Sequence, residues 1–336
     1  MRYSGIDMAC KSSAVCITDE QGKIVSEFEI PTDEDGFRAG LSRWDDLFCV
    51  IEASPLAEWV ARILEDLGHK VVVIDPRRAK AVICTKKKTD KLDARNLAKM
   101  GRTGWYTAVH RKSPEARLLR THMQARAGLV QSGKAQAARI RGLLRAHGIK
   151  LGKVSEGGFA NKVRAIIMKR QPELLPILEP LLSIWTQAKI EAKKMKKEIK
   201  RLSSKDKVCA QLMTAPGVGP LVVSAYVATI DDPKRFSSGD EIAAYIGLVP
   251  SVHQSGDTEY RGRITREGDG LLRTLLVEAA NVLLTRTKRD FALKRWGLAL
   301  QKEKGVGKAR VAVARKLAVL LHHMWMTGEK FDWAKA

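Results

Sequence analysis

The sequence lacks the features of several large protein classes. Its five cysteines, at positions 10, 16, 49, 84 and 209, form no Cys-x-x-Cys pair, so neither a zinc site nor a disulfide framework is indicated. No run approaches the ~18 apolar residues of a membrane-spanning helix. Asp7 interrupts the first apolar run, where a secretory signal would be uncharged. We therefore expect no membrane partner and a reducing compartment, the cytoplasm.

Acidic residues are scarce relative to basic ones. The 336 residues include 60 Lys and Arg but 37 Asp and Glu, for a formal net charge of +23. Residues 1–75 carry 7 basic and 15 acidic side chains, and the remainder carries 53 and 22. Because each neutralised phosphate releases counterions, this excess favours nucleic acid as the partner. A solvated basic surface is the simpler alternative, and nothing here resembles a lipid anchor.

The first hundred residues alternate between strand and helix patterns, and the length suggests about two domains. The expected order is three strands, helix, strand, helix, strand, which predicts a mixed sheet in an α/β domain. Thr32 begins the first helical pattern, and Pro55 opens the second, which Gly68 ends. The expected strands are residues 3–8, 14–18, 23–30, 47–53 and 69–76.

The pattern changes to basic helices near residue 113. We expect a domain over 1–112, a basic, coiled-coil-like helical linker over 113–207, and a mainly α C-terminal domain over 208–336. Within the linker, Pro114 begins a long helix, 148–160 is looser, and 174–202 is helical again. The last domain contains a polar loop over 250–270 and a closing amphipathic helix over 309–325.

Four carboxylates stand at positions that suggest a shared site. Asp7 ends the first strand and Glu52 the fourth, and these strands would lie side by side in the predicted sheet. Thr89 can cap a helix in which Asp90 and Asp93 share one face. Converging carboxylates repel unless a cation lies between them, and oxygen ligands suit Mg²⁺ or Mn²⁺.

Each acid has a structural alternative, since an Asp can end a strand or favour a helix N-terminus. The combination is more specific, because this order of strand-end acids and a later acidic helix is expected of a ribonuclease-H-like nuclease domain. Lys86, Lys87 and Lys88 flank the acids and would anchor a DNA strand, or form a solvated loop.

The C-terminal third contains two further motifs. Gly217 and Gly219, in PGVGP, would let backbone amides approach a phosphate as in helix-hairpin-helix proteins, or would allow tight helix packing. The polar loop contains Ser255, with nearby guanidinium groups to hold a phosphodiester. These are Arg261, Arg263 and Arg266. From the residues alone Ser255 is a turn serine.

Three other side chains in this third have local alternatives. Tyr260 is a competing hydroxyl in the same loop as Ser255. His253 is interpreted as a loop histidine. The pair His322–His323 is interpreted as the exposed end of a helix and not as a metal pair.

The segments GIDMACKSSAVCITDEQGKIV, VIEAS and KTDKLDARNLA resemble the DEDD motifs of the RuvC-like insertion-sequence transposases of the bacterial one-ten family. Residues 215–276, from APGVGP to RTLL, resemble the second signature of that family. The resemblance therefore covers nearly the whole chain.

This resemblance implies that Asp7, Glu52, Asp90 and Asp93 bind the metal and that Ser255 is the nucleophile. It implies an RNA-guided, serine-type DNA recombinase that forms a covalent phosphoserine link. The expected partners are the element ends, the target DNA, a structured guide RNA and further copies of the chain, from dimer to tetramer.

Two other functions remain open from the residues. One is a metal-dependent, Holliday-junction-type nuclease that hydrolyses DNA with water, in which Ser255 is structural. The other is a non-catalytic nucleic-acid-binding protein with structural acids. A sugar kinase is disfavoured because SSAVCITDEQG supplies no glycine-rich phosphate loop.

Overall fold

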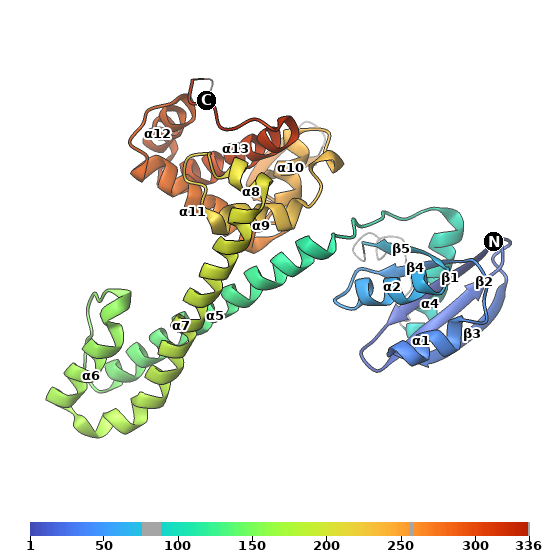
Figure 1. The fold of residues 1–336 in the computed structure, drawn as a ribbon, viewed down its shortest axis with the longest axis horizontal. Helices are drawn as coiled ribbons and strands as arrows, with labels where there is room; N and C mark the ends of the chain where they lie inside the picture. The colour runs from blue at the N-terminus through green and yellow to red at the C-terminus, as the bar shows by residue number, and fades with distance from the viewer. Residues whose placement is uncertain (76–88, 256–257, 335–336) are drawn as a thin grey trace. The chain divides into compact units, whose positions relative to one another are not determined.

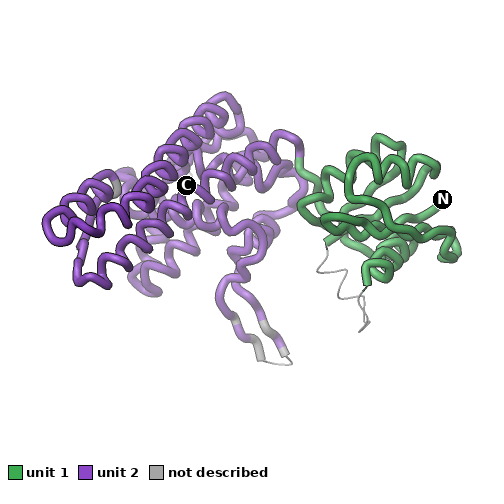
Figure 2. Tube along the Cα trace, turned by 90° about the horizontal axis from the view of Figure 1, so that it is seen from below, with its two compact units in different colours: residues 1–112 green, residues 113–336 purple. Residues whose placement is uncertain are grey.

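The computed structural model describes residues 1–75, 89–255 and 258–334. The chain divides into two compact units, residues 1–112 and 113–336 (Figure 2). Each unit has its own hydrophobic core.

The first unit is built around a five-stranded sheet of order β3-β2-β1-β4-β5. β1 pairs antiparallel with β2 and parallel with β4, so the sheet is mixed, as the sequence predicts. Its elements are β1 (Arg2–Met8), β2 (Ser12–Thr18), β3 (Ile24–Pro31), α1 (Glu34–Leu41), β4 (Leu47–Glu52), α2 (Ala57–Asp66), β5 (Lys70–Ile74) and α4 (Asp90–Thr103).

Helices cover both faces of this sheet (Figure 1). On one face, Ile6 and Ile51 pack with Phe37 of α1 and Val60 of α2. On the other face, α4 packs against β1, β2 and β4. Both faces are buried, which explains why the parallel strands read as continuous apolar runs.

His69 makes the first unit sensitive to mild acid. Its ring is buried, Nδ1 lies 3.4 Å from the Leu47 amide and Nε2 lies 3.3 Å from the Leu41 carbonyl. Burial lowers the pKa of His69 below its usual 6.5. The unfolded chain therefore binds the proton first, and stability is lost as the pH falls below 6.5.

We predict that His69→Gln weakens this pH dependence. Glutamine can donate to Leu41 and accept from Leu47, but it cannot take up a proton. One titrating histidine contributes a slope of at most about 1.4 kcal/mol per pH unit. Thermal unfolding at pH 7.5 and pH 5.5 measures it, and equal pH dependence in both proteins would contradict the assignment.

The second unit begins with a pair of long helices that lie side by side (Figure 1). Pro114 occupies the first turn of the first helix, as expected, and Ser113 caps that helix. Ile140, Leu178 and Trp185 belong to the core that joins the pair to α6. The elements are α5 (Pro114–Ala146), a 3-10 turn (Glu156–Gly158), α6 (Phe159–Arg170), a second 3-10 turn (Pro172–Leu174) and α7 (Leu175–Lys205).

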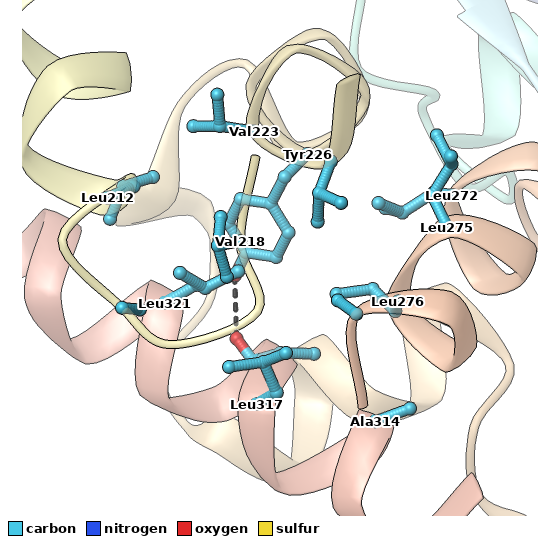
Figure 3. Packing of buried hydrophobic residues seen from close by; sticks show 14 of the residues in the cluster. Leu212, Val218, Val223, Tyr226, Leu272, Leu275, Leu276, Ala314, Leu317 and Leu321 are labelled. Carbon is cyan, nitrogen blue, oxygen red and sulfur yellow. Dashed lines mark hydrogen bonds between the residues drawn. The ribbon is translucent and has the colours of Figure 1, made fainter. Parts of the chain in front are cut away.

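The rest of the unit packs helices around Tyr226 (Figure 3). The tyrosine is fully buried, and its hydroxyl donates a hydrogen bond of 2.8 Å to the Ala318 carbonyl. The elements are α8 (Lys207–Leu212), α9 (Pro220–Ile230), a 3-10 turn (Pro233–Arg235), α10 (Gly239–Ile246), β6 (Pro250–Ser255), β7 (Thr258–Ile264), α11 (Gly270–Arg286), α12 (Ala292–Lys304) and α13 (Val306–Thr327). Among the described residues, no helix has the length and apolar composition to cross a membrane.

Three expectations need correction. The 250–270 segment was expected to be a loop because its composition is polar, but it contains an antiparallel hairpin, β6–β7. Helix α6 was not expected, because glycines and Pro172 flank its short apolar stripe. His322 is buried, and its Nε2 lies 2.9 Å from the Pro233 carbonyl, because the 3-10 turn packs on α13. Its neighbour His323 is exposed, as expected.

Candidate active site

Two of the predicted acids lie side by side at one edge of the first sheet. Ile6 of β1 pairs in parallel register with Ile51 of β4, so Asp7 and Glu52 occupy the next position on each strand. Side chains alternate between the faces of a strand. Because Gly5 lies against α4, Asp7 faces α4 as well, and Glu52 shares that face through the register.

Helix α4 starts at the same edge of the sheet. Its Ala94 lies against Gly5, whereas Gly101, two turns later, lies against Val50 and Phe48, nearer the start of β4. The helix therefore runs antiparallel to β1 and β4, and its N-terminus lies toward the ends of these strands.

The two acids of α4 lie in its first turn. Thr89 caps the helix by accepting a hydrogen bond of 3.3 Å from the Leu92 amide, as the sequence predicts. Asp90 and Asp93 are seven residues before Leu97 and Met100, which pack against the sheet. Positions seven apart lie on nearly the same helix face, so both acids lie on the sheet-facing side.

An ion pair fixes α4 on the sheet. Arg95 binds both carboxylate oxygens of Glu27 on β3, with 2.7 Å between Arg95 Nη2 and Glu27 Oε2. This contact lowers the pKa of Glu27 and raises that of Arg95. A bidentate pair fixes orientation as well as distance. Because Arg95 follows Asp93 by two residues, the pair helps to position the first turn of α4.

Gly5 is the position where α4 approaches β1 most closely. A Cβ atom added there would lie 2.0 Å from the Ala94 carbonyl oxygen and 2.3 Å from the Ala98 nitrogen, and both are backbone atoms that cannot rotate away. The absence of a side chain at Gly5 thus allows the contact that brings Asp90 and Asp93 to this edge.

We predict that Gly5→Ala destabilises the first unit by about 3 kcal/mol, because α4 must lift from the sheet. Thermal unfolding measures the loss. Gly142→Ala is the control, because a Cβ there meets nothing within 4 Å; it should stabilise α5 by about 0.5–1 kcal/mol. Similar effects of the two substitutions would refute the close approach.

The chemistry of the four acids fits a divalent cation, because hard carboxylate oxygens are the ligands that Mg²⁺ and Mn²⁺ prefer. Asp7, Glu52 and Asp93 are partly exposed and Asp90 is exposed. Within the described ranges, however, no three Asp, Glu, His or Cys side chains form a group that could hold an ion. The acids share an edge and a face of the sheet, and their joint binding of a metal ion stays a prediction.

Ser255 lies at the tip of the β6–β7 hairpin. It is the last residue of β6 and pairs with Thr258, the first of β7. Figure 2 shows the hairpin extending away from the helices of its unit. The side chains of Ser255, His253 and Arg261 lie outside the described part of the structure. Tyr260, the competing hydroxyl, is 66% exposed.

The base of this hairpin is held firmly. The Thr265 amide donates to the Val249 carbonyl at 2.9 Å, and Arg273 of α11 donates to the Ile246 carbonyl at 2.9 Å. Gly247 has a left-handed backbone conformation, and a Cβ atom there would lie 2.1 Å from the Glu267 carbonyl oxygen. Arg263 and Arg266 are exposed beside this base.

The glycines of PGVGP differ in their surroundings. Gly217 has a φ of +81° and lies so close to α11 that a Cβ would be 2.4 Å from the Ala279 carbonyl oxygen. Gly219 is the N-cap residue of α9, and a Cβ there meets nothing within 4 Å. The helix-packing alternative thus accounts for Gly217, and a helix-hairpin-helix contact is not needed to explain it.

Some positions of the site escaped the sequence reasoning. Gly5 and the Glu27–Arg95 pair position α4, but only the folded sheet brings them together. Lys86, Lys87 and Lys88 lie outside the described residues.

Comparison with known proteins identifies both halves of the chain. A family model for the DEDD domain of IS110-type transposases, described as "Transposase", matches residues 4–149. A second, described as "Transposase IS116/IS110/IS902 family", matches residues 209–294.

Curated relatives extend the likeness over most of the chain. The putative transposase y4pF/y4sB of Sinorhizobium fredii is 30% identical over 285 residues, 82% of this chain and 72% of the relative. The transposase for insertion sequence element IS1111A of Coxiella burnetii is 26% identical over 326 residues, 96% of this chain and 88% of the relative. A probable family 20 transposase of Pseudomonas aeruginosa is 29% identical over 81% of each chain.

The mixed sheet with its strand-end acids agrees with these matches, as does the mainly helical second unit. The chain therefore belongs to the IS116/IS110/IS902 family of insertion-sequence transposases, enzymes of DNA transposition.

Proposed function

We propose that this transposase cuts and rejoins DNA through a covalent link to Ser255, with carboxylates at the edge of the first sheet holding Mg²⁺ or Mn²⁺. The observation that carries the proposal is the β1–β4 register, which sets Asp7 beside Glu52 on the face that α4 covers. Asp90 and Asp93 enter the same edge from the start of α4.

These four acids would be the metal ligands. A bound divalent cation supplies a Lewis acid that polarises the scissile phosphate and stabilises a leaving oxygen. The chain itself contributes the fixed spacing of the ligands, because the Glu27–Arg95 pair and Gly5 hold α4 in register with the strands.

The hairpin would deliver the nucleophile. Ser255 lies at a tip that extends from an anchored base, which suits a hydroxyl that must approach a DNA backbone. Attack by its oxygen on phosphorus forms a phosphoserine ester and releases a DNA hydroxyl, and the reverse attack reseals the strand. Arg261, Arg263 and Arg266 would neutralise the phosphate charge.

The partners follow from the charge distribution. The net charge of +23 favours contacts with phosphates and with nucleic acid shape, neither of which reads a sequence. The choice of DNA sequence would then come from base pairing with a structured guide RNA. Lys86, Lys87 and Lys88, and the amides near Gly217 and Gly219, are proposed to contact the nucleic acid backbone. Strand exchange joins four DNA ends, so we propose a dimer or a tetramer in the nucleoid.

One reaction tests the proposal. The full-length protein is incubated with DNA carrying its own element ends, RNA transcribed from the flanking region, and Mg²⁺. We expect a protein–DNA adduct that survives denaturation and maps to Ser255 by mass spectrometry. Cleavage without an adduct would favour the hydrolytic nuclease, and an adduct formed equally without RNA would refute guidance.

A further inference from the structure

Helices α12 and α13 border a groove of about 830 Å³ in the second unit. Helix α13 contributes one continuous face, since the lining residues follow helical spacing of three and four. They are Ala312, Arg315, Lys316, Val319, Leu320 and His323. Helix α12 contributes Ala292, Leu293 and Trp296, which is 37% exposed, and α10 contributes Asp240.

The groove combines an aromatic surface with cations. Lys316 Nζ lies 4.1 Å from the centroid of the Trp296 ring, a cation–π contact. Arg315 is held by Asp240 of α10 at 2.7 Å. The ammonium is thus the cation that covers the indole, and the guanidinium is already paired.

This combination favours one kind of occupant. Single-stranded nucleic acid is bound by aromatic rings on which bases stack, beside basic groups that contact phosphates. A purely apolar ligand would not use the charge of Lys316, and an acidic peptide would not use the indole face of Trp296. The excess positive charge of the whole chain draws the same ligand.

We propose that this groove binds an unpaired nucleotide of a DNA strand. The phosphate attracts the Lys316 ammonium away from the indole, and the freed face of Trp296 stacks on the base. One cation–π contact is exchanged for an ammonium–phosphate ion pair and a stacked base. This groove shares no residue with the proposed catalytic groups, and the proposal does not depend on their roles.

Anisotropy titrations of the full-length protein test the two contacts separately. The probes are a labelled short oligothymidylate and an abasic strand of equal length. We expect Trp296→Ala to weaken binding of oligothymidylate by roughly tenfold while barely affecting the abasic strand. Lys316→Gln should weaken both and reduce the salt dependence by about one phosphate contact.

Two controls separate the groove from general effects. Trp105, 69% exposed in the first unit, is the matched aromatic, and Trp105→Ala should leave both affinities unchanged. Trp296→Phe should restore most of the binding, because phenylalanine also stacks.

Three results would overturn the proposal. Equal losses on the two probes in Trp296→Ala would remove stacking as the cause. A tenfold larger loss of oligouridylate binding than of oligothymidylate binding in Trp296→Ala would assign the groove to RNA. Unchanged binding in both groove variants, whether or not their oligomeric state changes, would exclude a nucleotide.

Discussion

Replacement of Asp7 by asparagine is expected to reduce DNA strand cleavage on the order of 10³-fold or more. The amide keeps the size of the carboxylate, but it replaces one acceptor oxygen with an NH2 donor and removes the charge that would hold a divalent cation. Cleavage of labelled element ends in the presence of Mg²⁺ measures the effect. Glu52→Gln, at the neighbouring position of β4, should give a loss of the same order.

Asp35→Asn is the matched control for this loss. Asp35 is an exposed acid of α1, and α1 packs on the opposite face of the sheet from α4. It should cleave DNA at the normal rate. Thermal unfolding should be unchanged in all three variants, and normal cleavage by Asp7→Asn would contradict a catalytic role for this edge.

Substitution of Ser255 by alanine is expected to abolish the covalent protein–DNA adduct and strand joining, by at least about 10³-fold. The methyl group has no oxygen that can attack phosphorus, and binding of the DNA should remain. Quantification of the adduct on a denaturing gel measures the effect.

Two substitutions in the same hairpin show whether the loss belongs to Ser255. Ser251→Ala removes another hydroxyl from β6, and Tyr260→Phe removes the competing hydroxyl of β7. Both should form the adduct. If Tyr260→Phe alone abolishes it, the nucleophile is the tyrosine. If Ser255→Ala still cuts while Asp7→Asn does not, the enzyme hydrolyses DNA with water.

The sheet was predictable because its sequence signals are local. Buried parallel strands read as apolar runs, and crossover rules place the first strand beside the fourth, which brings Asp7 next to Glu52. The cap at Thr89 was visible because a hydroxyl before an acidic turn is a helix-start signal.

Other features depend on contacts between distant residues. The hairpin around Ser255 has strands of mostly polar composition, so its hydrophobic periodicity carries little information. From the sequence, Gly217 could allow either phosphate binding or close helix packing, and only the position of Ala279 in the fold indicates the packing role. The orientation of the four carboxylates was equally inaccessible, because the direction of a side chain depends on rotamers and neighbours.

Anomalous diffraction from crystals soaked in Mn²⁺ tests the central claim most directly. The account predicts a peak bounded by the carboxylates of Asp7 and Glu52 and by at least one of Asp90 and Asp93, and the loss of that peak in Asp7→Asn crystals. Manganese bound only elsewhere, or a peak that persists without the Asp7 carboxylate, would contradict it.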